Sequence, residues 1–385
     1  MNDKAIIINA SIFDGKYFIK ASQIKFEDGI IREISNKQSK MPTGYKIYDL
    51  KNKIISPGFI DMHTHGAGGI DAMDITSPKQ VKLMAKAFAK TGVTSFLLAC
   101  FFDKKNSFNA TYFDNNNSTA ARFLGLYMEG PFISTLKKGS ISEEYISKTN
   151  ANIKKIMDAI NKSYGTLKVM TLAPELKQAM EVSKLLAKKH VIAAFGHSAA
   201  DYVKTKSALK SGIHHVTHLF NAMQGFHHRK PGPFTAIVEN LNTTVELIAD
   251  GTHVHPVIIR FAIKLLGIER VILITDSTAM LDYKAGKYYL KKSGTVVVKA
   301  GAAFRADGTL FGSCTTLLDM VKNTKKWCDL NNEQVLRMVT YNPAKLLGLK
   351  RVGRIAKGCF ADFNVLDENL KLYEVFVGGI PISQA

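Results

Sequence analysis

Eight apolar runs recur along the middle of this 385-residue chain, and each run ends in polar residues. Helix-period segments separate them, as in TSPKQVKLMAKAFAKTG, where Ser77 can cap a helix and Pro78 suits its first position. Strands that alternate with helices form a parallel sheet. The runs are GFIDMHTH, GVTSFLLAC, FLGLYMEG, LKVMTLAPE, VIAAFGHS, IHHVTHLFN, VELIADGTH and VILITDS. A closed (β/α)8 barrel of the TIM type needs this number, so we predict an α/β barrel over residues 57–354.

Short strands without helices are predicted at both ends of the chain. Near the start, AIIINASIFDGKYFI and IKFEDGIIREI alternate apolar stretches with turns, and Asp28-Gly29 is a hairpin dipeptide. Near the end, GRIAKGCFADFNVLD and LYEVFVGGIPI show the same pattern. We therefore expect residues 1–56 and 355–385 to build one small β-sandwich domain together.

The charge of the chain fits two classes of partner. Lys and Arg number 52 against 32 for Asp and Glu, a net charge of +20 that would suit nucleic acid or an acidic small molecule. The basic residues are spread out, without a dense arm or an interleaved aromatic platform. We therefore expect a small-molecule substrate and no nucleic-acid partner.

The sequence also bears on the compartment. No apolar run reaches the roughly 20 residues that span a bilayer, and the start MNDKAIIINASIFDGKYF lacks the order of a secretory signal. The four cysteines are scattered without metal or redox spacing, which favours free thiols. We expect a cytoplasmic protein without a membrane partner.

Residues of the types that bind metal ions collect at the ends of the predicted strands, the barrel face where such folds place their sites. Glu129, His197 and His218 make a ligand set suited to a catalytic divalent ion. Each histidine taken alone is more often a core or loop residue, but the shared position favours ligation. The full set is His63, His65, Glu129, His197, His218, His253 and Asp276.

Asp276 is the candidate proton carrier. A divalent ion makes water a usable nucleophile near neutral pH, and a carboxylate beside it can accept the proton. The same group can then protonate a departing amine, which amide hydrolysis requires. The alternative for Asp276 is an N-cap on the following helix.

An ordered set of longer motifs resembles one family. They are PGFIDMHTHG, GVTSFL, GLYMEGPFI, KKG, LAPE, GHSAADY, THLFNAM, HHRKPG, ADGTHVHP, LITDSTAM, Gly312-Ser313 and YNPAKLLGL. Over nearly its whole length the chain resembles the N-acetylglucosamine-6-phosphate deacetylases of the amidohydrolase superfamily. The resemblance implies an enzyme that hydrolyses the acetyl amide of N-acetylglucosamine 6-phosphate to give glucosamine 6-phosphate and acetate.

The resemblance implies a metal site and a catalytic residue. Asp276 would be the general acid and base, and the ion, zinc or iron, would be one or two in number. His63 and His65 would permit the second ion. The implied metal ligands are Glu129, His197, His218, His63 and His65.

The resemblance also implies a substrate site. The sugar would lie near Asn221 and Ala222, and the phosphate would contact Arg229 and His253. In this family part of the phosphate contact comes from an adjacent subunit, so a homodimer is implied.

Two positions depart from the family pattern. Ile141 stands where the family usually has a histidine that positions the substrate and polarises its carbonyl, and LLACFF stands where Pro-Thr is more usual. Either a neighbouring group or a second metal takes over from the histidine, or the substrate differs. The alternatives are an amidohydrolase for another N-acetylated sugar phosphate or a cyclic amide, and a non-catalytic sugar-phosphate-binding relative.

Overall fold

An eight-stranded, all-parallel sheet forms the centre of the molecule. The computed structural model describes residues 4–36, 43–103, 110–113, 120–146, 153–162, 166–177, 179–291 and 294–384. The strand order β17-β16-β15-β14-β13-β12-β11-β8 confirms the eight strands expected from the sequence. Their bounds are β8 Phe59–Thr64, β11 Val93–Phe101, β12 Arg122–Glu129, β13 Leu167–Leu172, β14 Ile192–Phe195, β15 His215–Val216, β16 Thr244–Leu247 and β17 Val271–Leu273.

The two ends of this sheet meet just beyond β17. The backbone N–H of Asp276 donates to the carbonyl of His63 at 2.9 Å, and that of His65 donates to Ser277 at 2.8 Å. We call this pairing of residues 63–65 with residues 276–277 the seam. Because the seam joins the first strand to the chain after the last one, the sheet closes into a barrel.

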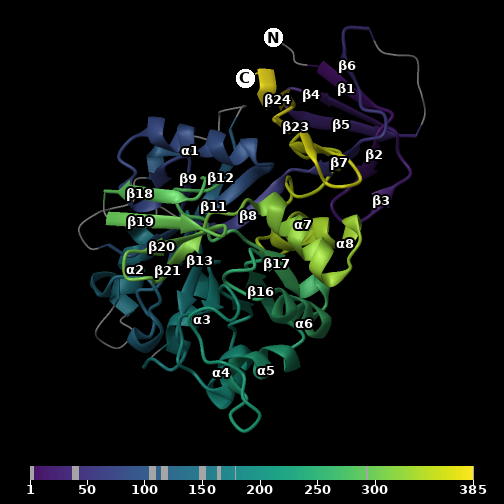
Figure 1. Ribbon diagram of the computed structural model, residues 1–385. Helices are drawn as coiled ribbons and strands as arrows, with labels where there is room; N and C mark the ends of the chain where they lie inside the picture. Colours follow the sequence, from purple (N-terminus) through teal and green to yellow (C-terminus); the bar gives the residue numbers. More distant parts are fainter. Residues whose placement is uncertain are drawn as a thin grey trace.

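Helices cover the outside of the barrel (Figure 1). The first of them, α1, begins at Pro78 and is capped by the Ser77 side chain, as the sequence predicted. Its buried residues include Met84 and Phe88, which belong to the main hydrophobic core. The helices are α1 Pro78–Lys90, α2 Ile153–Lys162, α3 Ala179–Lys188, α4 Tyr202–Lys210, α5 Gly232–Glu239, α6 Pro256–Leu266, α7 Leu317–Cys328, α8 Asn332–Arg337 and α9 Tyr341–Leu346.

A four-stranded antiparallel sheet lies between β17 and α7, and the sequence analysis did not predict it. We call it the inserted sheet; its strands are β18 Gly286–Leu290, β19 Gly294–Lys299, β20 Ala302–Arg305 and β21 Leu310–Ser313, in sequential order. Met280, Val296 and Val298 belong to a small hydrophobic cluster of its own. The sheet is therefore a separate packing unit attached to the barrel.

Two further sheets, one of N-terminal strands and one that combines strands from both ends of the chain, confirm the predicted β-sandwich. One has the order β5-β4-β1-β6 and the other β24-β23-β22-β7-β2-β3. Figure 1 shows the purple N-terminal strands beside the yellow C-terminal ones. The ring of Phe26 contacts those of Phe363 and Phe376 at centroid distances of 5.7 and 6.3 Å. The strands are β1 Lys4–Ile8, β2 Ser11–Phe13, β3 Phe18–Ile19, β4 Gln23–Glu27, β5 Ile30–Ser35, β6 Lys46–Asp49, β7 Ile54–Pro57, β22 Phe363–Leu366, β23 Leu372–Val377 and β24 Ile380–Pro381.

Local details of the sequence are also confirmed. Asp28 and Gly29 both have positive φ, 50° and 73°, in the tight hairpin between β4 and β5. The cysteines are free thiols, and Cys100, Cys314 and Cys359 are buried. Within the described ranges, no helix has the length and apolar character needed to cross a membrane.

Candidate active site

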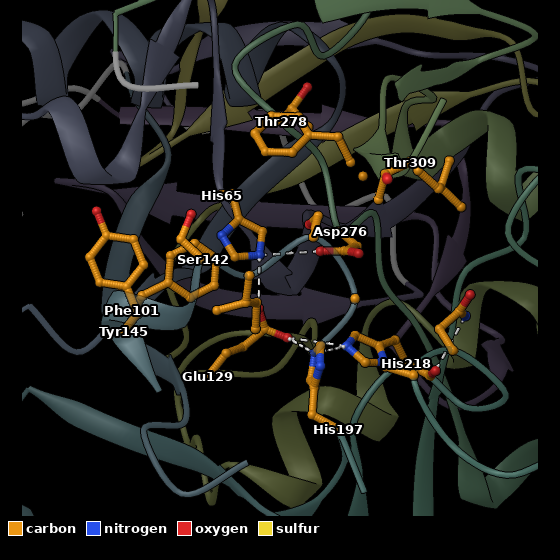
Figure 2. A pocket seen from close by; sticks show the side chains of 18 of the residues that line it. His65, Phe101, Glu129, Ser142, Tyr145, His197, His218, Asp276, Thr278 and Thr309 are labelled. Carbon is orange, nitrogen blue, oxygen red and sulfur yellow. Dashed lines mark hydrogen bonds and ion pairs between the residues drawn. The ribbon is translucent and has the colours of Figure 1, made fainter. Parts of the chain in front are cut away.

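A pocket opens at the carboxyl ends of the barrel strands (Figure 2). Its cavity measures about 300 Å³. Asn221 and Ala222 line it together with most of the residues that the sequence placed at strand ends. Those residues are His65, Glu129, His197, His218, His253 and Asp276.

Glu129, at the end of β12, is the centre of the first candidate metal site. Its Oε1 lies 3.1 Å from His218 Nε2 and 3.2 Å from His197 Nε2, and the two Nε2 atoms are 3.0 Å apart. The carbonyl of Lys137 is 2.9 Å from His197 Nδ1. Because a carbonyl only accepts, Nδ1 carries the proton and Nε2 presents its lone pair to the cluster. Two imidazole nitrogens and a carboxylate oxygen therefore converge, as a divalent ion requires.

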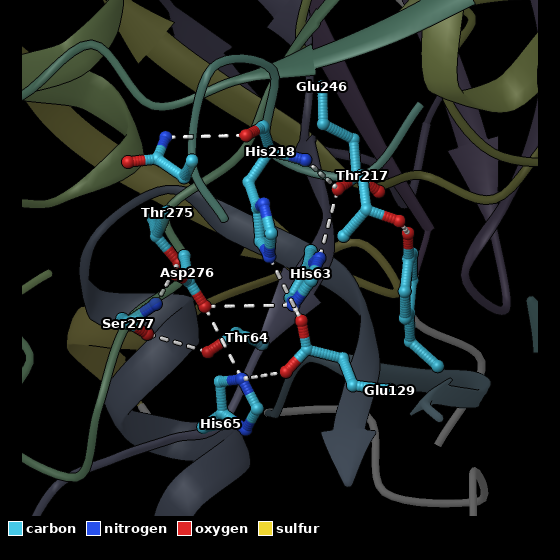
Figure 3. A network of polar contacts seen from close by, with 12 residues as sticks. His63, Thr64, His65, Glu129, Thr217, His218, Glu246, Thr275, Asp276 and Ser277 are labelled. Atoms are coloured by element: carbon cyan, nitrogen blue, oxygen red, sulfur yellow. Dashed lines mark hydrogen bonds and ion pairs between the residues drawn. The ribbon is translucent and has the colours of Figure 1, made fainter. Parts of the chain in front are cut away.

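His63 and His65 form a second set with the same glutamate (Figure 3). His65 Nε2 lies 3.3 Å from Glu129 Oε2 and 3.3 Å from Asp276 Oδ1. His63 Nε2 lies 3.5 Å from Glu129 Oε1 and 3.6 Å from Asp276 Oδ1. Among the described residues this buried nitrogen has no hydrogen-bond partner. An orphaned buried nitrogen that faces two carboxylates fits a metal ligand. We call His63, His65, Glu129, His197, His218 and Asp276 the strand-end cluster.

Glu246 on β16 supports the cluster from behind. Its fully buried carboxylate lies 2.9 Å from His63 Nδ1 and 3.1 Å from His215 Nε2, and it accepts the backbone N–H of His218 at 3.1 Å. Since a carboxylate accepts, His63 donates from Nδ1 and leaves Nε2 free for the cluster. The sequence analysis missed this residue. The available signal was an acid in the middle of an apolar strand, which must have buried partners.

The charges in the cluster reinforce one another. Burial disfavours protonated imidazole, but the surrounding carboxylates outweigh it and raise the pKa of His63 to about 9 and that of His65 to about 10. Burial would raise the pKa of Glu129, yet the imidazoles of His197 and His218 beside it hold that pKa well below its usual value. Burial also opposes ionisation of Asp276, but His65 and His63 lower its pKa. Both carboxylates are therefore ionised near neutral pH, and a cation would compete with the imidazole protons for the site.

The backbone that carries these side chains is unusual. His197, His218 and Asp276 have φ values of 46°, 26° and 48°, in the region that favours glycine. Non-glycine residues there cost about 1–2 kcal/mol each, and such strain clusters at functional sites. Glu175, from the LAPE motif, holds the turn after His197 by accepting from Ser198 Oγ and Ala199 N, both at 2.6 Å.

Asp276 is not a helix cap. Its carboxylate faces His65, whereas Thr316 caps α7, the next α-helix along the chain. The structure thus excludes the capping alternative for Asp276.

The two positions that depart from the family pattern, Ile141 and the LLACFF stretch with Phe101, lie on one side of the pocket. Ile141 is 3% exposed and packs with Ile133 and Ile146, in a cluster that Phe101 and Tyr145 also contact. The rings of Phe101 and Tyr145 are stacked with centroids 5.5 Å apart. Phe101 also lies 5.3 Å from His65, measured between ring centroids. We call Phe101, Ile141 and Tyr145 the apolar wall.

The two residues predicted to contact the substrate phosphate, His253 and Arg229, lie in different places. His253 lines the pocket and lies 2.6 Å from Asp250 Oδ2 through its Nδ1. Arg229 is exposed, is not among the lining residues, and has its Nη1 2.8 Å from His228 Nε2. The inserted sheet instead supplies lining residues that the sequence analysis missed, among them Arg305 and Leu310.

Comparisons with known proteins agree with this geometry. The amidohydrolase family model matches residues 54–381. The chain is 30% identical over 381 residues to the N-acetylglucosamine-6-phosphate deacetylase of Bacillus subtilis (strain 168), covering 97% of this chain and 95% of that protein. It is 30% identical over 364 residues to the N-acetylgalactosamine-6-phosphate deacetylase of Escherichia coli O157:H7, covering 93% of each. A mutant N-acetyl-D-glucosamine-6-phosphate deacetylase from Mycobacterium smegmatis, solved with N-acetyl-D-glucosamine-6-phosphate, superposes with a TM-score of 0.87 at 27% identity, covering 99% of both chains.

Proposed function

This chain belongs to the amidohydrolase family, and we propose that it removes the acetyl group of N-acetylglucosamine 6-phosphate by hydrolysis of the amide C–N bond. The products are glucosamine 6-phosphate and acetate. The single observation that carries the proposal is the strand-end cluster, where Glu129, His197 and His218 converge beside an ionised Asp276.

The residues present fit a divalent ion. Glu129, His197 and His218 would hold it, and His63 and His65 with Glu129 could hold a second one. When bound, such an ion supplies Lewis acidity, which polarises a carbonyl oxygen and makes water a usable nucleophile near neutral pH. Zinc and iron both suit imidazole with carboxylate, and we propose these two metals.

Asp276 carries the proton in this proposal. Its ionised carboxylate can accept a proton from the attacking water at Oδ1, the oxygen that lies 3.3 Å from His65 Nε2. The protonated acid then donates to the amide nitrogen as the C–N bond breaks, because an amine leaves far more readily than its anion. Asn221 and Ala222 would position the sugar, and His253 would contact the phosphate.

Acetate release tests the function directly. Purified protein should release acetate from N-acetylglucosamine 6-phosphate, lose this activity on chelation, and regain it when zinc or iron is added back. The amount of bound metal, measured in the same samples, shows whether each chain holds one ion or two. Metal-replete protein that releases no acetate would overturn the proposal and favour the non-catalytic alternative.

A second candidate substrate is the C4 epimer, N-acetylgalactosamine 6-phosphate. Two observations favour testing it: Ile141 replaces the family histidine, and one relative at 30% identity is named for that substrate. The ratio of kcat/KM for the two epimers decides between them. A ratio that favours the galactose epimer would replace the glucose assignment.

We also propose a homodimer, a cytoplasmic location, and the domain boundaries 1–56 with 355–385 and 57–354. The exposed position of Arg229 outside its own pocket supports the dimer, because a neighbouring pocket could receive it. The free cysteines suit a reducing compartment. Light scattering gives the mass in solution, and cell fractionation gives the location.

A further inference from the structure

Arg305 is the one lysine or arginine among the residues that line the pocket, within the ranges that the structure describes. The lining carboxylates outnumber it: they are Asp71, Glu129, Glu144 and Asp276. A phosphorylated sugar would bring a dianion into this acidic surrounding. A dianion needs a cation close by, so the position of Arg305 bears on how such a substrate is held.

The guanidinium of Arg305 is held in place but not neutralised. It lies over the ring of Phe311, 4.7 Å from the centroid, and its Nη2 donates to the carbonyl of Ser140 at 3.0 Å. In the described part of the chain no carboxylate lies within ion-pair distance of it, although the exposed carboxylate of Asp307 interacts with it electrostatically. A guanidinium has five N–H donors in a rigid fork, and a carbonyl uses one of them. Among the residues that the structure describes, the remaining donors have no hydrogen-bond partner, so they can bind an anion.

Arg305 also reaches the place where the family pattern is broken. Its acceptor, Ser140, directly precedes Ile141, whose side chain is buried among apolar neighbours and has no hydrogen-bond donor. Arg305 itself ends strand β20, so it enters the pocket from the inserted sheet rather than from a barrel strand. Arg305 therefore brings a polar group from the inserted sheet to the loop in which Ile141 replaces the family histidine.

We propose that Arg305 binds the phosphate group of the substrate from within the same chain. This inference rests on the proposed function, because it assumes a phosphorylated substrate. It differs from the phosphate contact predicted for Arg229, which lies outside the pocket of its own chain. Arg305 is a substrate-binding residue in this proposal and takes no part in proton transfer.

Arg305→Gln tests the proposal, because glutamine can still donate to Ser140 but carries no charge. With N-acetylglucosamine 6-phosphate its KM should rise about 10- to 100-fold at nearly unchanged kcat, the range expected for a lost charge-assisted hydrogen bond. With N-acetylglucosamine, which lacks the phosphate, kcat/KM should not change. Arg305→Lys should recover part of the loss because it restores the charge.

Lys299→Gln is the matched control. Lys299 lies on β19 of the same sheet, is exposed, and has its Nζ 4.6 Å from the centroid of the Phe304 ring, yet it does not line the pocket. Removing this charge should leave both substrates unaffected. A KM increase in this variant equal to that of Arg305→Gln would show that the change in KM comes from the general surface charge, and it would overturn the proposal.

Calorimetry makes the test independent of turnover. Binding of glucosamine 6-phosphate and of glucosamine is measured for wild type and Arg305→Gln; only the phosphorylated sugar should bind more weakly to the variant. Equal losses for both sugars would place Arg305 on the sugar and overturn the proposal, as would no loss at all. If wild type releases no acetate, the proposed function fails on that result alone, while the binding comparison still decides whether Arg305 holds a phosphate.

Discussion

The strand-end cluster and the apolar wall border the same pocket but are built differently. The cluster residues sit at or directly after barrel strands, and their imidazoles and carboxylates contact one another within a few ångströms. The wall residues Ile141 and Tyr145 come from the loop after β12, and Phe101 ends β11. The cluster keeps the family pattern, whereas the wall departs from it at Phe101 and Ile141. We therefore propose that the barrel frame carries the reaction chemistry and that the parts that vary around it set the selectivity.

The largest effect is expected at Asp276, where a substitution tests whether the strand-end cluster carries the chemistry. Asp276→Asn keeps the shape but removes the proton acceptor, so kcat for acetate release should fall by about 10²–10⁴-fold. Metal content, measured by elemental analysis, should stay at the wild-type value. A variant that lost its metal as well would show that Asp276 is needed mainly to hold the ion.

The second-largest effect, a loss of metal affinity, is expected when Glu246, which supports the cluster, is replaced. Glu246→Gln removes the charge that fixes the tautomer of His63, and loss of such a partner typically costs about 10–100-fold in metal affinity. Competition with a chelator gives this affinity. Unchanged affinity together with unchanged kcat would mean that the buried network of Glu246 serves folding rather than the site.

In the wall, a smaller effect on stability is expected at Ile141. Ile141→His restores the family residue but places a polar ring among Ile133 and Ile146, so the free energy of unfolding should fall by about 1–3 kcal/mol. Ile141→Val is the control and should cost about 0.5–1.5 kcal/mol. Urea titration measures both. A histidine variant as stable as wild type and faster in turnover would show that the wall tolerates the family arrangement.

The smallest effect should come from Tyr145. Tyr145→Phe keeps the ring that stacks on Phe101, so kcat/KM should change less than about twofold. Tyr145→Ala removes the stacked ring and is the comparison. A large loss in the phenylalanine variant would give the hydroxyl a polar role and end the description of this region as apolar.

The sequence could predict the cluster because its signals are periodic. Buried parallel strands leave long apolar runs, and the residue types after each run place His63, Glu129 and Asp276 on one face before any coordinates exist. Glu246 was missed because a single acid inside an apolar run does not identify the residues that it contacts. Its contacts with His63 and His215 follow from barrel closure, which brings distant segments together.

The inserted sheet could not be predicted for a different reason. Its strands are short, and KYYLKKSGTVVVKAG has the same alternation as any surface hairpin. Nothing in that pattern says that Arg305 turns toward a pocket or that its carbonyl partner is Ser140. Such loop and sheet contacts depend on packing between segments far apart in sequence. The proposed domain boundaries and the roles of Arg229 and His253 stay predictions.

The seam has a consequence for how the protein is made. A growing chain has all five predicted metal ligands once residue 218 has been added, but Asp276, which pairs with His63 across the seam, is not yet there. At about 5–20 residues per second, roughly 3–12 s pass before it is synthesised. Until then the seam cannot form and the barrel stays open, so the ligands of the strand-end cluster are not yet held together. The site is therefore completed only after residue 277 has been added, although its predicted metal ligands are all made earlier.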